Sequence, residues 1–207
     1  MTILIRKPRV AFQGEPGAFS EQAATTLLGD EIELVPRKTF PDLFSSVDDG
    51  MADFVLAPVE NTIAGVIQPS VDLLRSSPLA IVDEVEIKIE QHLIACPTAS
   101  FDTIETVQSH PVALAQCSRF FATNPQLKSV IAEDTAGSVA EVIRLGDPKR
   151  AAIAGERAAK LYDGSIIRRS IQDLTENYTR FVLLRSRASA STQQNPTYPA
   201  LVKEQTS

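Results

Sequence analysis

Short apolar runs alternate with amphipathic segments along this chain of 207 residues, and Gly or Pro stands at many of the joins. The runs 9–13 (RVAFQ) and 53–59 (DFVLAPV) have the length and composition of buried strands. The segment 20–28 has the pattern of a helix, and Gly29 stands where such a helix would end. Strands that alternate with helices predict an α/β fold with at least partly parallel sheets.

The same alternation continues as far as residue 184. Further extended segments are predicted at 81–94, 106–109, 129–132, 150–154 and 181–184. Further helices are predicted at 40–49, 71–75, 111–121, 134–145 and 156–162. The residues 188–207 are rich in Ser, Thr, Gln and Pro, so we expect a flexible tail there.

Composition argues against several classes of protein. The formal net charge is −6 and the basic residues form no stripe, so we expect no nucleic-acid partner. No apolar run approaches the roughly 20 residues that span a membrane, and the N-terminal residues lack the pattern of a secretory signal, so we expect a cytoplasmic protein without a membrane partner. The two cysteines and two histidines are scattered, and we expect neither a metal nor a cofactor.

Four predicted joins between a strand and a helix carry small or polar residues. They are 14–20, 60–65, 109–111 and 134–137. Helix N-termini offer unpaired N–H groups and favour anions, although simple capping is the better explanation of any single join. Several such joins at comparable points of α/β units indicate a cleft for a small anionic ligand.

The segment 176–181 places a hydroxyl, a guanidinium and an aromatic ring beside a predicted buried strand. In a regular strand, Thr179 and Phe181 face one side and Arg180 faces the other. All three can serve one pocket only if the segment lies at an irregular entrance of the strand. Otherwise Arg180 makes a surface ion pair.

Six segments follow one another between about residue 9 and residue 184: 10–20, Pro58-Val59-Glu60-Asn61-Thr62, 109–117, 134–136, 171–173 and Thr179-Arg180-Phe181. In this order they resemble the motifs of the prephenate dehydratase family. Each motif is weak by itself, but the ordered set is specific. Thr62 and Val112 stand where the family usually has Ser and Gln, and Gln91-His92-Leu93 stands where many members have His-Cys-Leu.

The resemblance implies two α/β lobes with mixed, mostly parallel sheets, similar to type 2 periplasmic binding proteins, and an active site in the cleft between them. We expect residues 1–89 plus 171–187 to form the first lobe and residues 90–170 to form the second. Many family members carry a C-terminal ACT domain that binds phenylalanine, and we expect none here. The family also implies a homodimer or a higher homo-oligomer.

The activity that the resemblance implies is the decarboxylative dehydration of prephenate to phenylpyruvate, in phenylalanine biosynthesis. Thr179 would donate to the leaving hydroxyl, Arg180 would clamp a carboxylate and Phe181 would pack on the ring. Glu60 and His110 could act as acids or be structural. The remaining substrate contacts are expected from Ser20, Asn61, Thr62, Ser109, Thr135 and Ala136.

Three other activities stay open. An arogenate dehydratase would perform the same reaction on the amino analogue of prephenate. A prephenate decarboxylase without dehydration is expected to alter the tripeptide that holds Thr179, which this chain keeps. A binding protein for a small organic anion could share the two-lobed layout without any chemistry.

Overall fold

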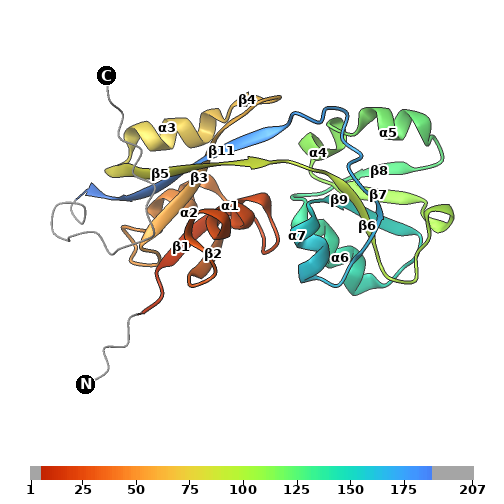
Figure 1. Ribbon diagram of the computed structural model, residues 1–207, viewed down its shortest axis with the longest axis horizontal. Coiled ribbons are helices and arrows are strands. Elements are labelled where there is room, and N and C mark those ends of the chain that lie inside the picture. Colours follow the sequence, from red (N-terminus) through yellow and green to blue (C-terminus); the bar gives the residue numbers. More distant parts are fainter. Residues whose placement is uncertain (1–5, 188–207) are drawn as a thin grey trace.

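The computed structural model describes residues 6–187, and these residues form two lobes, each built on one sheet (Figure 1). The first sheet has the strand order β2-β1-β3-β11-β5, with β4 paired to β3, and the second has the order β10-β6-β9-β7-β8. The strands of the first sheet are β1 (Arg9–Gln13), β2 (Glu33–Arg37), β3 (Phe54–Asn61), β4 (Gly65–Val66), β5 (Leu79–Lys88) and β11 (Tyr178–Ser186). Those of the second are β6 (His92–Ala95), β7 (Thr106–Ser109), β8 (Lys128–Ile131), β9 (Arg150–Ala154) and β10 (Ser165–Arg168).

Both sheets are mixed, as predicted. β1 pairs in parallel with β2 and β3, and β7 pairs in parallel with β8 and β9. The strand β11 runs antiparallel to both β3 and β5, and β6 runs antiparallel to β9 and β10. Antiparallel pairing is therefore more extensive than the sequence suggested.

The central strands of the first sheet are buried on both faces. Val55 and Leu184 belong to a core on one face, whereas their neighbours Leu56 and Leu183 belong to a core on the other. Because side chains alternate along a strand, such strands read as continuous apolar runs, which is why they were visible in the sequence. The helices that cover this sheet are α1 (Phe19–Leu28), α2 (Phe40–Ser45) and α3 (Gln68–Ser76).

The second sheet also has one apolar core on each face. Ile153 of β9 packs into one core, and its neighbours Ala152 and Ala154 pack into the other. The covering elements are α4 (Pro111–Ala115), α5 (Ser118–Thr123), α6 (Ala136–Leu145), α7 (Glu156–Leu161) and the 3₁₀ turn η1 (Phe101–Thr103). Within residues 6–187, none of the helices has the length and apolarity that a bilayer crossing requires.

The chain crosses between the sheets twice, after β5 and before β11, and the two crossings lie side by side (Figure 1). The amide of Ile89 donates to the carbonyl oxygen of Asn177 at 2.7 Å, and the amide of Ile171 donates to the carbonyl oxygen of Gln91 at 2.8 Å. These bonds hold the two crossings together, so the lobes are joined by a paired connection rather than by two independent linkers.

Two predicted elements are interrupted and a third is shorter than the sequence suggested. The segment 81–94 is divided between β5 and β6, because residues 89–91 form the crossing between the lobes. The predicted helix 111–121 is broken into α4 and α5, because the side chain of Asp173 accepts hydrogen bonds from the amides of Ser118 and Arg119 and so caps a new helix. The predicted helix 40–49 stops at Ser45, and turns follow. The tail predicted at 188–207 lies outside the described residues.

Candidate active site

A cavity of about 400 Å³ lies between the two lobes and is lined by residues from both. Its walls include the loops that follow β1, β7 and β8, at the carboxyl ends of these parallel strands, where ligands of α/β proteins bind. The entrance of β11 and the end of β3 complete the first-lobe wall. The polar lining residues are Gln13, Glu15, Ser20, Asn61, Gln91, His110, Gln116, Glu133, Asp134, Thr135 and Thr179.

The side chains of Thr179 and Asn61 meet in this cavity. Thr179 is 8% exposed, and its hydroxyl oxygen accepts a hydrogen bond from the Asn61 side-chain amide at 2.9 Å. Since this bond occupies an acceptor position of the hydroxyl, the proton of the hydroxyl stays available for a ligand. Thr179 is therefore placed as a donor toward the cavity.

Five hydrogen bonds fix the orientation of the Asn61 amide. Its oxygen accepts from the amides of Ile63 and Ala64, at 3.0 and 2.8 Å, in the turn between β3 and β4. Its nitrogen donates to the side-chain oxygen of Asn177, the carbonyl oxygen of Tyr178 and the hydroxyl of Thr179. Exchanging the amide oxygen and nitrogen would break four of these contacts, since only the Thr179 hydroxyl could bond to either atom. We predicted Asn61 as a substrate contact, and the geometry adds the orientation of Thr179 to that role.

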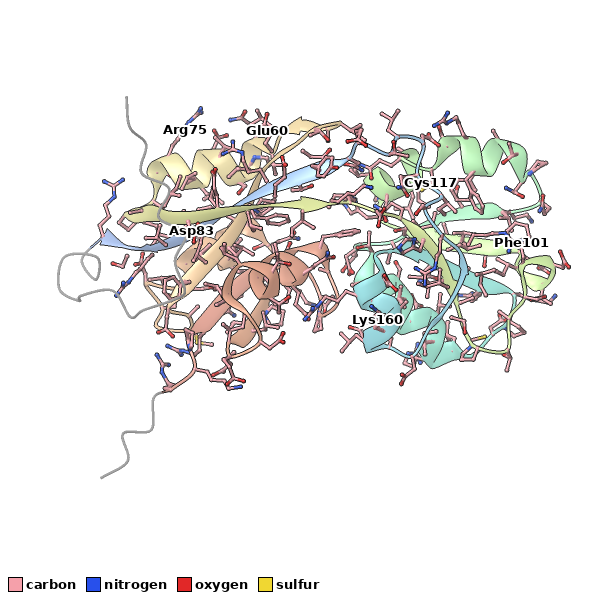
Figure 2. The ribbon with its side chains drawn as sticks, viewed as in Figure 1. Glu60, Arg75, Asp83, Phe101, Cys117 and Lys160 are labelled. Carbon is pink, nitrogen blue, oxygen red and sulfur yellow. The ribbon has the colours of Figure 1, made fainter. Side chains whose placement is uncertain are left out.

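Arg180 lies on the opposite face of the sheet from Thr179. Its guanidinium contacts the carboxylates of Glu60 at 3.2 Å and Glu84 at 3.4 Å, and all three side chains are about half exposed. Alternation along β11 explains this placement, because Thr179 and Phe181 face the cavity and Arg180 between them faces outward. Figure 2 shows Glu60 near β4. The expected contacts of Arg180 and Glu60 with a ligand in the cleft are therefore not supported by the structure.

A bulge in β3 makes this division possible. Arg180 pairs with Glu60, but the next residue, Phe181, pairs with Pro58, so that Val59 has no opposite partner. The bulge turns both Pro58 and Asn61 toward the cavity although they are three residues apart.

The other predicted site residues divide into two groups. Ser20, His110, Thr135 and Phe181 line the cavity. Of the described residues, Ser109, Ala136 and Thr62 are not in its wall: the Ser109 hydroxyl donates to the carbonyl oxygen of Ile153 at 2.6 Å, Ala136 is buried in the second lobe, and Thr62 is hydrogen bonded to the backbone of residues 176 and 178. These three placements have one cause, since each side chain is used within the fold.

The ring of His110 is oriented by its own loop. Its Nδ1 accepts a hydrogen bond from the amide of Val112 at 3.2 Å. In a neutral ring with Nδ1 as acceptor, the proton is on Nε2, so His110 offers a donor rather than an acceptor.

The carboxylates and the glutamine side chains of the cavity wall were not predicted from the sequence as site residues. Glu15, Glu133 and Asp134 line it, and none of the lining residues between positions 6 and 187 is Lys or Arg. Gln91 and Gln116 also line it, and the only signal for them was their position beside or within the family motifs. Over the described part of the chain, no group of three or more His, Cys, Asp or Glu side chains could hold a metal ion.

Comparison with known proteins decides the family. The family model described as prephenate dehydratase matches residues 10–189. The chain belongs to the prephenate dehydratase family. A bifunctional chorismate mutase/prephenate dehydratase of Enterobacter agglomerans is 32% identical over 94% of this chain and 51% of its own length. The chain thus spans about half the length of the curated relatives that it matches.

A plant relative and a solved structure are also similar to this chain. An Arabidopsis thaliana protein named arogenate dehydratase/prephenate dehydratase 1, chloroplastic, is 37% identical over 86% of this chain and 45% of its own length. The solved structure of prephenate dehydratase from Arthrobacter aurescens in complex with L-Phe superposes with a TM-score of 0.79 and 25% identity, over 86% of this chain and 60% of that one.

Proposed function

We propose that this chain catalyses the decarboxylative dehydration of prephenate to phenylpyruvate. The observation that carries the proposal is the Thr179 hydroxyl, which accepts from Asn61 and lies in the interlobe cavity of a member of this family. Prephenate carries two carboxylates and a ring hydroxyl. Loss of carbon dioxide and of the hydroxyl produces a benzene ring, and aromatisation supplies a large driving force.

The electrons of the bond between the ring and its carboxylate move into the ring while the bond from the ring to the hydroxyl breaks. The departing hydroxide needs a proton, and Thr179 is placed to provide one by hydrogen-bond donation or by relay from water. A threonine hydroxyl is a weak acid, so its effect on the rate depends on its position. A positioned donor accelerates such a step by roughly 10²–10⁴-fold.

Neutral donors would hold the substrate oxygens. Ser20 and Thr135 lie at the start of α1 and α6, where helix N–H groups favour anions. The Nε2–H of His110 is a further donor, and Phe181 offers an apolar surface for the ring. Arg180 and Glu60 have no direct contact with the substrate in this proposal.

Incubation of the purified chain with prephenate tests the proposal. The expected result is enzyme-dependent appearance of phenylpyruvate, detected by its absorbance after base is added. Tight binding of prephenate with no product above the uncatalysed rate would overturn the proposal and would favour a binding protein for small organic anions.

Arogenate is a second candidate substrate, and the charge of the cavity favours it. Three carboxylates and no Lys or Arg line the cavity among the described residues. Arogenate has an ammonium group where prephenate has a keto oxygen, so it carries one negative charge less. A negative wall attracts the ammonium and repels a dianion. Comparison of kcat/KM for the two substrates distinguishes the candidates.

We further propose that the enzyme is a hydro-lyase that acts in the cytoplasm as a homodimer or a higher homo-oligomer. Its first lobe would consist of residues 1–89 plus 171–187, and its second lobe of residues 90–170. Cys96 and Cys117 are both free and buried, which is consistent with a reducing compartment. Light scattering tests the oligomeric state, and a monomer at micromolar concentration would contradict it.

A further inference from the structure

Gln91 lies in the cavity wall, and hydrogen bonds hold its backbone in place. It lies in the crossing between β5 and β6, lines the cavity and is 3% exposed. Its amide donates to the side-chain oxygen of Gln172 at 3.0 Å, and its carbonyl oxygen accepts from the amide of Ile171 at 2.8 Å. The other crossing thus holds the Gln91 backbone on both sides, which restricts where the side chain can point.

The side-chain oxygen of Gln91 is buried without a hydrogen-bond partner among the described residues. The nitrogen of the same amide donates to the side-chain oxygen of Gln116 at 3.4 Å, so the nitrogen has a partner and the oxygen has none. Nearly all buried polar atoms in folded proteins have a partner. An unsatisfied acceptor on a residue of a cavity wall therefore indicates that a ligand supplies the donor.

The two candidate substrates differ in the group that such an acceptor can recognise. The keto oxygen of prephenate is itself an acceptor and would leave the Gln91 oxygen unpaired. The ammonium of arogenate has three donors and a positive charge. Glu15, Glu133 and Asp134 in the same wall favour that charge as well.

We infer that Gln91 is a specificity-determining residue whose side-chain oxygen accepts a hydrogen bond from the ammonium group of arogenate, the second candidate substrate. This contact favours the amino substrate over its keto analogue. The inference rests on the proposed decarboxylative dehydration and names the substrate group that the cavity distinguishes.

The ratio of kcat/KM for arogenate to that for prephenate tests the inference in wild type, Gln91→Leu and Gln91→Glu. Gln91→Leu removes the acceptor, and the ratio should fall about 10- to 100-fold, the value of a hydrogen bond to a charged group. Gln91→Glu keeps an acceptor and adds a negative charge, so the ratio should stay at or above that of wild type. Because both rates come from one preparation, a loss of folded enzyme cancels.

Gln68→Leu is the matched control, because Gln68 is exposed at the start of α3 and bonds only to Asp72 through its side-chain nitrogen at 2.6 Å. It should leave the ratio unchanged. An unchanged ratio in Gln91→Leu would overturn the inference. A ratio that rises in Gln91→Leu would also overturn it, because the amide nitrogen rather than the oxygen would then face the substrate.

Binding of the two products gives a measurement that does not depend on turnover. Calorimetry should show that Gln91→Leu weakens binding of phenylalanine, which has the ammonium, more than binding of phenylpyruvate, which has the keto group. If neither substrate is converted but this difference appears, the proposed function fails and the role of Gln91 stands. If both substrates are converted, but Gln91→Leu changes neither the kcat/KM ratio nor the relative binding of the two products, the role of Gln91 fails and the proposed function stands.

Discussion

Arg157 of α7 and Glu21 of α1 form an ion pair across the two lobes, with 2.6 Å between Nη2 and Oε1. Glu21 is almost fully buried, whereas Arg157 is one-third exposed. The second carboxylate oxygen of Glu21 accepts from the amide of Gly17 at 2.8 Å. The pair therefore links the loop at the start of α1, which is part of the cavity wall, to the second lobe.

Replacing Arg157 with Met should destabilise the protein, because the Glu21 carboxylate then stays buried without its cation. We expect a loss of about 1–3 kcal/mol in the free energy of unfolding, less than for a fully buried pair because Arg157 is partly solvated. Denaturant titration measures it. Lys160→Met, which breaks the exposed pair with Glu156, is the control and should change stability by less than about 1 kcal/mol. Equal losses in the two variants would contradict the special role of the interlobe pair.

Gly17→Ala tests the same interface through the backbone. Gly17 has φ +90°, and an added Cβ would lie 3.0 Å from the Cα of Ala158 in the other lobe. Gly50 also has a positive φ, +66°, but an added Cβ there would meet nothing within 4 Å. Gly50→Ala should therefore cost only about 1–2 kcal/mol for the left-handed backbone, and Gly17→Ala should cost clearly more. Thermal unfolding compares the stability of the two variants. Similar melting temperatures would show that the lobes move apart at Gly17 without a cost in stability.

The sequence predicted the central strands well and missed two of the four edge strands. β3 and β11 are buried on both faces, so their apolar runs are unmistakable. Besides the two-residue β4, the missed strands are β2 and β10, which each lie at an edge of a sheet and contain no buried residue, and β2 contains Pro36. Edge strands tolerate polar residues and proline, so their sequences lack the pattern that identifies a buried strand.

The sequence predicted those residues of the site that belong to a family motif. The motifs identified Thr179, Asn61 and His110, all of which line the cavity. The face on which Arg180 lies depends on the regular alternation of β11, and the pairing of β11 with β3 across a bulge decides its neighbours. Such long-range pairing leaves no local pattern in the sequence. The unsatisfied oxygen of Gln91 likewise exists only because the two crossings meet.

Thr179→Val should abolish most of the turnover while the protein stays folded. Valine has nearly the shape of threonine but lacks the hydroxyl, so the donor to the leaving group is lost and the fit to β11 is kept. We expect kcat to fall by roughly 10²–10⁴-fold with KM changed little, because the interaction strengthens in the transition state. Thr179→Ser keeps the hydroxyl and should retain much more of the rate. Near-full turnover in Thr179→Val, with an unchanged circular dichroism spectrum, would exclude the assigned role.

The stability of the protein should fall as the pH drops below about 6.5, the ordinary value of a histidine. Burial, and secondarily the charge of Arg169, lowers the pKa of His92, and its neutral Nδ1 accepts from the amide of Ser170 at 3.0 Å. In this range the unfolded chain binds a proton at His92 that the folded chain does not, so acid favours unfolding. His92→Asn, whose side-chain oxygen can replace Nδ1, should show a shallower decline between pH 7.5 and 5.5 in denaturant titrations. Parallel declines in the two proteins would assign the effect to other groups.

Neither cysteine should react with a thiol reagent in the native protein at pH 8. Cys117 lies in the second lobe beside α4 and is fully buried (Figure 2). Burial, and secondarily the charge of Asp173, raises the pKa of its thiol to about 12, so the reactive thiolate is scarce at pH 8. Cys96 is only 4% exposed, which restricts access of a reagent. Ellman's reagent should therefore count no thiols in the native state and two in denaturant, and one in denatured Cys117→Ala. Rapid reaction of one thiol in the native protein, abolished by Cys117→Ala, would show that the α4–α5 region opens readily.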